Sequence, residues 1–165
     1  MSFLKIKENE YLSTFYGFMY SFIIVGFFIV TKSFRDSLFL NNFTKSDLSY
    51  IYLFTPIISG LLVWITLLAV KKKTLFKKSL LTHLVICVIS IILLNHLSPA
   101  SIVIYYIFVE FHIGLIAIVF WDVLSESFNN RQAKRLFTII TSGGFLSALI
   151  VGSTLPILSK YFSQT

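Results

Sequence analysis

The stretch Ala100–Trp121 reads ASIVIYYIFVEFHIGLIAIVFW, and it contains Glu110 but no Lys or Arg. A helix of about 20 mainly apolar residues spans the ~30 Å hydrocarbon core of a lipid bilayer. Further runs of similar length and composition occupy Tyr11–Thr31, Tyr50–Val70, Ser79–Leu97 and Leu136–Leu158. We therefore expect an integral membrane protein that crosses the bilayer several times.

The length and continuity of these runs also predict the fold class. Backbone groups in lipid must pair with one another, which leaves helices and closed barrels, and barrel strands are short and alternate in polarity. We expect an all-α, polytopic transmembrane bundle of about five helices. The loops are short and no Pro/Gly/Ser-rich linker is present, so residues 1–165 are predicted to form one membrane domain. The first run lacks a small-x-small cleavage site after it, which favours a retained helix over a signal peptide.

Charge follows the pattern of a membrane protein. Of the 165 residues 56% are hydrophobic and 13% are charged, and 14 Lys and Arg outnumber 7 Asp and Glu. Most basic residues fall on one side of the predicted membrane, before the first run, in Lys71–Lys78 and in Arg131–Arg135. The positive-inside rule then predicts a cytoplasmic N-terminus and an external C-terminus. Because topology accounts for the basic excess, we expect contact with membrane lipids and no nucleic-acid partner.

Glu110 is the first candidate functional residue. An acidic side chain near the middle of a membrane helix costs about 3 kcal/mol, so something must offset this cost. The carboxyl group is protonated, paired with a cation from another helix, or open to a water-filled cavity, and each alternative places it inside the bundle. An acid in this position is a functional-site hypothesis by default.

Arg35 is the second candidate, because Lys32, Arg35 and Asp36 directly follow the first apolar run. If that helix continues through Leu40, it carries Arg35 toward the bundle at the external end. A guanidinium group there can hold a phosphate group through two hydrogen bonds. Simple extension of a flanking charge to the membrane surface remains the alternative. We therefore take Arg35 and Glu110 as candidate substrate-binding residues.

Other polar residues give weaker signals. His112 lies about 200° around the helix from Glu110, so we expect it to cap a neighbouring helix or lie near lipid headgroups. His83 and Cys87 have the spacing of half a metal site without another half, and we predict no metal and no cofactor. No nucleophile–base pair, P-loop, HExxH or paired-carboxylate pattern is present, so we expect no enzymatic activity.

Small residues predict where helices approach each other closely. The candidate packing positions are Gly114 and Ala117 on the face of Glu110, and Gly144, Ala148 and Gly152 in the last run. Pro56 stands beside Thr55, Ser59 and Gly60, a combination expected to kink the second helix while a hydroxyl group pairs with the freed carbonyl.

Two stretches resemble a known family. Phe120–Phe128 (FWDVLSESF) is followed by Arg131–Phe137 (RQAKRLF) and Gly143-Gly144, and Lys32–Leu40 reads KSFRDSLFL. Their order and spacing are similar to the ATP/ADP translocase family, the nucleotide transporters of plastids and obligate intracellular bacteria, which are related to the major facilitator superfamily. The family usually has Asn shortly after the FW pair, where this chain has Asp122-Val123-Leu124-Ser125.

The resemblance implies roles for individual residues. It places Arg35 where the family has a basic residue important for transport, and Glu110 where it has a membrane-embedded glutamate before the FW pair. Lys134 and Arg135 match the basic part of the following loop. The implied substrate is an anionic small molecule such as a nucleotide.

The resemblance also implies a larger assembly. Such carriers have about twelve helices in two halves, so this chain resembles the N-terminal fragment of a nucleotide-exchange-type carrier that needs a C-terminal half. We expect a multi-pass protein of the bacterial inner membrane. The alternative is a non-transporting scaffold, accessory subunit or degenerate remnant that binds partner helices through its small-residue faces.

Overall fold

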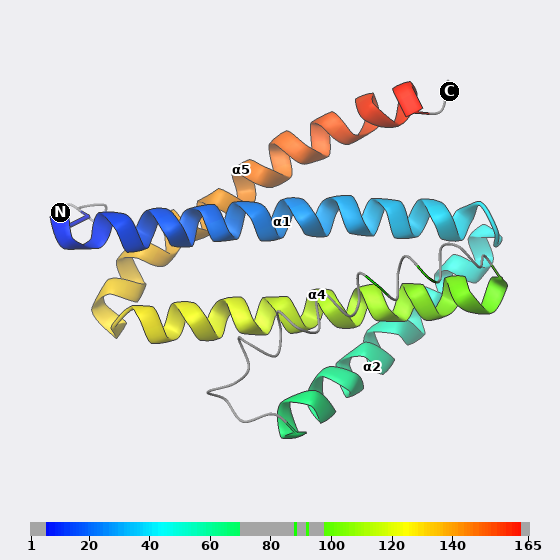
Figure 1. The fold of residues 1–165 in the computed structure, drawn as a ribbon, viewed down its shortest axis with the longest axis horizontal. Coiled ribbons are helices and arrows are strands. Elements are labelled where there is room, and N and C mark those ends of the chain that lie inside the picture. Colours follow the sequence, from blue (N-terminus) through cyan, green and yellow to red (C-terminus); the bar gives the residue numbers. More distant parts are fainter. Residues whose placement is uncertain (1–5, 70–87, 89–91, 93–97, 163–165) are drawn as a thin grey trace. The chain divides into compact units, whose positions relative to one another are not determined.

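The computed structural model describes residues 6–69, 88, 92 and 98–162, and long helices make up most of these residues. The short helix η1 (Glu8–Glu10) leads into α1 (Tyr11–Leu40), and three more long helices follow (Figure 1): α2 (Lys45–Ala69), α4 (Pro99–Ser127) and α5 (Asn130–Phe162). No strand occurs in the described ranges. The predicted run Ser79–Leu97 lies outside them except for the helical Val88 and Ile92, as do His83, Cys87 and Lys71–Lys78.

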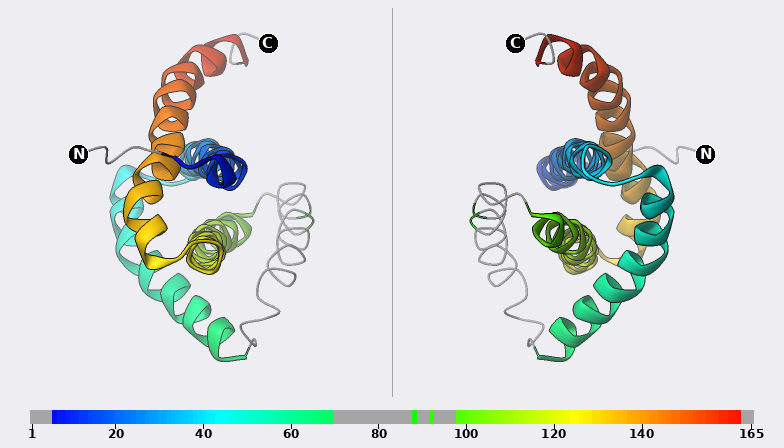
Figure 2. Two further views of the ribbon diagram at one scale, coloured as in Figure 1. Left: turned by 90° about the vertical axis from the view of Figure 1, so that its left-hand side faces the viewer. Right: turned by 90° about the vertical axis from the view of Figure 1, so that its right-hand side faces the viewer.

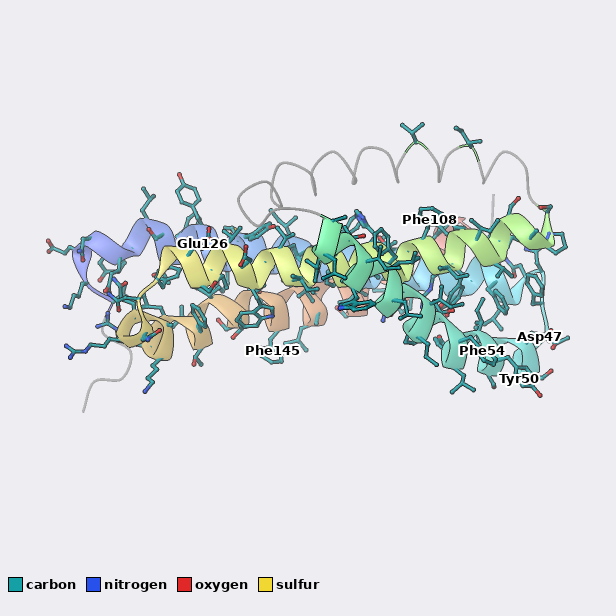
Figure 3. All side chains as sticks on the ribbon, turned by 90° about the horizontal axis from the view of Figure 1, so that it is seen from below. Asp47, Tyr50, Phe54, Phe108, Glu126 and Phe145 are labelled. Atoms are coloured by element: carbon teal, nitrogen blue, oxygen red, sulfur yellow. The ribbon has the colours of Figure 1, made fainter. Side chains whose placement is uncertain are left out.

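The four long helices among the described residues confirm the all-α fold class and make a multi-pass membrane protein plausible. Each is long and apolar enough to cross a bilayer, and at most 44% of its most apolar segment is buried inside the protein. Large apolar side chains such as Phe54 and Phe145 project outward (Figure 3). Small polar residues such as Thr55 and Ser147 are buried instead. This arrangement suits lipid, which solvates apolar side chains as well as another helix does.

Polar caps define where α4 and α5 start, and α5 begins at Asn130, before the apolar run at Leu136. The Oγ atom of Ser98 accepts a hydrogen bond from the backbone N of Ser101 at 3.1 Å, just before α4. Asn129 Oδ1 accepts one from the backbone N of Gln132 at 3.0 Å, at the start of α5. Such caps satisfy backbone donors that the first turn leaves free. Hydropathy locates only the part of each helix in the hydrocarbon core.

The chain forms two compact units, and the first comprises Met1–Thr31 and Phe120–Thr165. In this unit α1 and α5 approach closely (Figures 1 and 2). A Cβ atom added at Gly143 would collide with the backbone carbonyl of Phe18, and one at Gly144 would lie 2.8 Å from Val25 Cγ2. A Cβ atom at Gly26 of α1 would lie 2.7 Å from Ser147 Oγ. Glycine therefore permits this contact from both helices.

The second unit spans Lys32–Val119 and contains the end of α1, α2 and most of α4. Its apolar cluster is built on Phe39, Ile102 and Tyr106. The Phe39 ring stacks on Phe43, with 4.4 Å between ring centroids, and meets Tyr106 edge-on at 5.4 Å. These contacts hold the end of α1 against α4. They also place the residues that precede Phe39 beside α2 and α4.

Helix α2 continues through Pro56 to Ala69. Proline removes a backbone donor from the helix. The Ser59 hydroxyl donates to the carbonyl of Pro56 itself, at 3.3 Å. The carbonyl that Pro56 leaves without a helical donor is that of Tyr52, four residues before the proline. Ser59 therefore does not pair with the freed carbonyl but with the carbonyl of Pro56.

Candidate functional site

The end of α1 carries Arg35 into the second unit. Helix α1 runs through Arg35 to Leu40, so the continuation that the sequence left conditional is present. The Arg35 side chain is 2% exposed and is one of the largest fully buried side chains. It is therefore an interior residue and not a flanking charge at the surface. A buried guanidinium must be compensated by charges and hydrogen bonds.

Arg35 is compensated from several directions. Its Nη1 atom donates to Glu110 Oε2 of α4 in an ion pair. Its Nε atom donates to Asp36 Oδ1 at 3.0 Å, and its Nη2 atom lies 2.9 Å from the same oxygen in an ion pair. The guanidinium carbon lies 3.8 Å from the centroid of the Tyr106 ring, which is within cation–π distance. The group is thus held by two carboxylates and one aromatic face.

Glu110 pairs with cations from α1, one of the three states that the sequence left open. Besides Arg35, its partner is Lys32, whose Nζ lies 3.7 Å from Glu110 Oε1. The Glu110 side chain is 22% exposed and that of Lys32 is 46% exposed. Glu110 therefore lies between a buried cation and an accessible one.

Asp36 connects three helices. Its Oδ1 atom accepts a hydrogen bond from the Tyr106 hydroxyl of α4 at 2.8 Å. Its Oδ2 atom accepts one from the Tyr52 hydroxyl of α2, also at 2.8 Å. Sequence reasoning noted Asp36 only as a neighbour of Arg35 and missed both tyrosines. The available signal was the position of Tyr106 one helical turn before Glu110, on the same face.

Together these six side chains form the ion network, which is defined as Lys32, Arg35, Asp36, Tyr52, Tyr106 and Glu110. Its formal charges are two cations and two carboxylates, which balance. Interactions between charges are stronger in a site of low dielectric than in water. An anion can enter such a site at low cost only if it takes the place of one carboxylate.

A second polar cluster lies in the first unit, where η1 meets α5. Glu10 is 4% exposed, and Arg135 Nη2 donates to its two carboxylate oxygens at 2.7 and 2.6 Å. Gln132 Nε2 donates to Glu10 Oε1 at 3.0 Å, and the backbone N of Lys7 donates to Oε2 at 3.0 Å. The sequence did not single out Glu10.

The assignment of Lys134 and Arg135 to a loop was wrong, because both lie within α5. The cap at Asn129 starts the helix before them, and Arg135 pairs with Glu10 from within the helix. His112 is buried in the second unit and does not lie among lipid headgroups. Of the four candidate spans among the described residues, α4 has the largest buried fraction in its most apolar segment, 44%. His112 is therefore covered although it lies on another face of α4 than Glu110.

The predicted packing residues have different surroundings. A Cβ atom at Gly114 would lie 3.4 Å from Val63 Cγ2 of α2, which is an ordinary contact. Ala117 and Ala148 are partly buried. Gly144 lies in the close contact with α1, whereas an added Cβ atom at Gly152 would meet nothing within 4 Å among the described residues.

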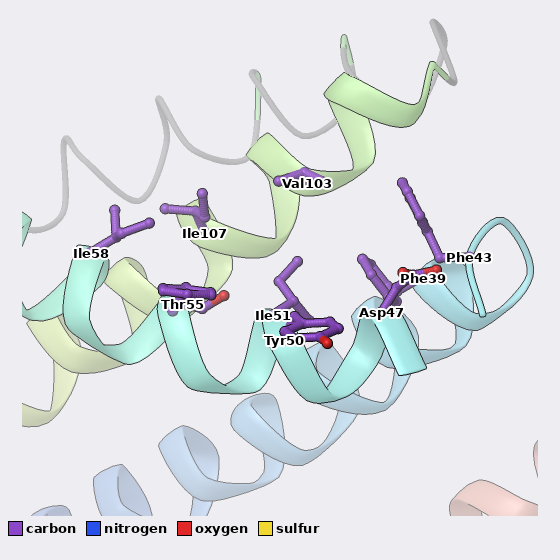
Figure 4. A pocket seen from close by; sticks show the side chains of 10 residues that line it. Phe39, Phe43, Asp47, Tyr50, Ile51, Thr55, Ile58, Val103 and Ile107 are labelled. Atoms are coloured by element: carbon purple, nitrogen blue, oxygen red, sulfur yellow. The ribbon is translucent and has the colours of Figure 1, made fainter. Parts of the chain in front are cut away.

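A pocket of about 290 Å³ lies between α2 and α4 in the second unit (Figure 4). Its walls are mainly aromatic and aliphatic, and Phe39 and Phe43 line one end. Neither Arg35 nor Glu110 lines it. Its lining contains Asp47 and no basic residue, so this pocket does not suit an anion.

In the part of the chain that the structure describes, no group of three His, Cys, Asp or Glu side chains is arranged to hold a metal ion. Comparisons with known protein families, curated proteins and solved structures find no match. The ion network is therefore the basis for an inference about function.

Proposed function

We propose that the chain is part of a membrane carrier for small anions, the N-terminal portion of an ATP/ADP exchange-type or related major-facilitator-like carrier. The observation that carries this proposal is Arg35, an ionised side chain buried among membrane helices and held by carboxylates. Ionisable residues inside membrane helices commonly belong to substrate or ion pathways.

Stability alone is a poor reason for this arrangement. Replacing a buried ion pair with apolar residues of similar volume is often neutral or stabilising. The second unit already has an apolar cluster at Phe39, Ile102 and Tyr106, directly beside the network. A function that requires charged groups explains better why a guanidinium and two carboxylates lie next to that cluster.

The proposed mechanism is an exchange of partners at Arg35. An incoming oxyanion first meets Lys32, the accessible cation, and then replaces the Glu110 carboxylate at Arg35 Nη1. The displaced Glu110 has Lys32 as its remaining partner, whose Nζ lies 3.7 Å from Oε1 before the exchange. When the anion leaves, Glu110 returns, so the guanidinium is never left without an anionic partner. This exchange lets the site bind an anion and also release it.

The resemblance of Lys32–Leu40 and Phe120–Phe128 to the ATP/ADP translocase family supports adenine nucleotides as the first cargo to test. The same resemblance supports a requirement for a C-terminal half, because the substrate site of such carriers lies at the interface of the two halves. Membrane lipids and a nucleotide are thus the proposed partners. The proposed location is the bacterial inner membrane.

The test is uptake of labelled ATP and ADP by intact cells. The chain is expressed alone and together with a matching C-terminal half, and membrane insertion of both parts is verified. We expect uptake only with both parts, and loss of uptake in Arg35→Gln and Glu110→Gln with insertion unchanged. Uptake at the wild-type level in both variants, or no uptake despite insertion of both parts, would contradict the proposal.

The second candidate function is a non-transporting scaffold. It is favoured by α5, where Gly152 meets nothing in the described part of the chain and Phe145 is 73% exposed. A small-residue face of this kind can accept a partner helix closely. A stable complex with an unrelated membrane protein that is lost in Gly152→Leu, in cells that show no anion uptake, would favour the scaffold.

A further inference from the structure

The two carboxylates that pair with Arg35 are not equivalent. Asp36 Oδ1 accepts a hydrogen bond from Nε and lies 2.9 Å from Nη2, on one edge of the guanidinium, whereas Glu110 Oε2 accepts from Nη1. A guanidinium group presents its donors in a fixed planar fork. With Asp36 on the Nε side, Nη1 remains for Glu110, and the second planar edge of the fork, formed by Nη1 and Nη2, includes this atom.

The carboxylates also differ in how firmly they are held. Both Asp36 oxygens accept tyrosine hydroxyls, from Tyr106 and from Tyr52 on different helices. Among the described residues, the Glu110 carboxylate is held by the two cations of α1, and the Lys32 contact is long at 3.7 Å. Glu110 is therefore the partner that an external anion can replace, and Asp36 is the partner that stays.

We propose that Asp36, held by Tyr52 and Tyr106, is a positioning residue. It orients Arg35 so that the Nη1–Nη2 edge receives a ligand group with two coplanar oxygens, a carboxylate or a phosphate, in place of Glu110. Glu110 is then an internal competitor for the ligand site. This inference rests on the proposed anion-binding function, and it adds the chemistry of the ligand and opposite roles for two acids.

Replacing Asp36 and replacing Glu110 should change the affinity for the anion in opposite directions. Electrostatics alone predicts a change in the same direction for both variants. Removal of either negative charge next to Arg35 leaves a more positive site, which by charge alone strengthens anion binding in both variants. If Asp36 positions the guanidinium, its loss weakens binding although the site becomes more positive. Only the removal of Glu110, the competitor, strengthens it.

The experiment measures equilibrium binding of ATP, inorganic phosphate and acetate to the full chain in phosphatidylcholine nanodiscs. Phosphate and acetate distinguish the two oxyanion chemistries. Because Glu110 no longer competes, we expect Glu110→Gln to bind the preferred probe roughly tenfold more tightly, the factor that one charge-assisted hydrogen bond supplies. We expect Asp36→Asn to bind it at least about tenfold more weakly.

The tyrosines provide variants that leave every formal charge in place. Tyr52→Phe and Tyr106→Phe each remove one donor to Asp36, and Tyr106→Phe keeps the aromatic face under Arg35. Both should weaken binding, by less than Asp36→Asn does. Asp47→Asn is the matched control, because Asp47 is a carboxylate of the same unit whose hydrogen bonds go to Thr44. This control should bind each probe as the wild type does.

The outcomes separate the two claims. Tighter binding in both Asp36→Asn and Glu110→Gln, with unchanged binding in the tyrosine variants, overturns the positioning role and leaves an anion site at Arg35. Absence of binding of all probes to both the wild type and Glu110→Gln overturns this inference, and the uptake assay with the C-terminal half then decides the proposed function separately. Loss of binding in Asp36→Asn and partial loss in each Tyr→Phe variant, at unchanged helical content, supports it.

Discussion

The close contact of α1 and α5 makes a quantitative prediction about two glycines of the same helix. At Gly143 an added Cβ atom meets the backbone carbonyl of Phe18, and at Gly152 it meets nothing within 4 Å in the described part of the chain. A backbone atom cannot move aside by changing a rotamer. Gly143→Ala therefore has to separate the helices, whereas Gly152→Ala does not.

The magnitude follows from comparing the two variants. Each replacement gains the helix preference of Ala over Gly, up to about 1 kcal/mol, and this gain cancels in the difference. The steric term remains, and inserting one methyl group into a tightly packed site typically costs about 1–3 kcal/mol. We expect Gly143→Ala to be less stable than Gly152→Ala by that amount.

The assay is equilibrium unfolding of the purified full chain in mixed micelles, followed by far-ultraviolet circular dichroism. Gly152→Ala is the matched control, since it makes the same chemical change on the same helix. Stabilities that agree within about 0.5 kcal/mol, the usual range for substitutions that touch nothing, would refute the α1–α5 packing described above.

Two further predictions concern residues next to the two ends of α1. Because Arg135 and Gln132 both donate to Glu10, Glu10→Gln should lower the unfolding midpoint in the same assay. The exposed Glu8 is the control, and an equal effect of Glu8→Gln would contradict a specific role of the cluster. The second prediction uses a background in which Cys87, the one cysteine of the sequence, is replaced. In this background Glu8→Cys should react with an impermeant maleimide only from the cytoplasmic side, and Asn42→Cys only from the external side. The reverse pattern would contradict the topology that the basic residues predict.

The existence of the helices was predictable from hydropathy, because any segment in the hydrocarbon core must be apolar and must satisfy its own backbone. Their ends were not predictable in this way. Helix α5 begins at Asn130, before the apolar run at Leu136, because Asn129 provides the cap. Capping is a local polar signal at the start of a helix, which a hydropathy window does not register.

The small-residue pattern shows a different limit. The four-residue spacing of Gly144, Ala148 and Gly152 predicted one packing face on α5, but it could not tell which part of this face meets another helix. In the structure the closest approach includes Gly143 and Gly144, and Gly26 contributes from α1. Which glycines meet depends on where two helices cross, and this is set by both helices together.

By itself the sequence determined that a long apolar helix carries Glu110 at a position where an isolated charge is costly, and it left open whether Arg35 lies in the interior or extends to the surface. It could not determine their partners, because residues 75 positions apart meet only when α1 and α4 pack. The tertiary structure decided that these two residues pair and that Asp36 binds the hydroxyls of Tyr52 and Tyr106. The physical reason is that burial cost is a property of one residue in its own helix, whereas compensation of a charge is a property of the neighbours that folding brings together.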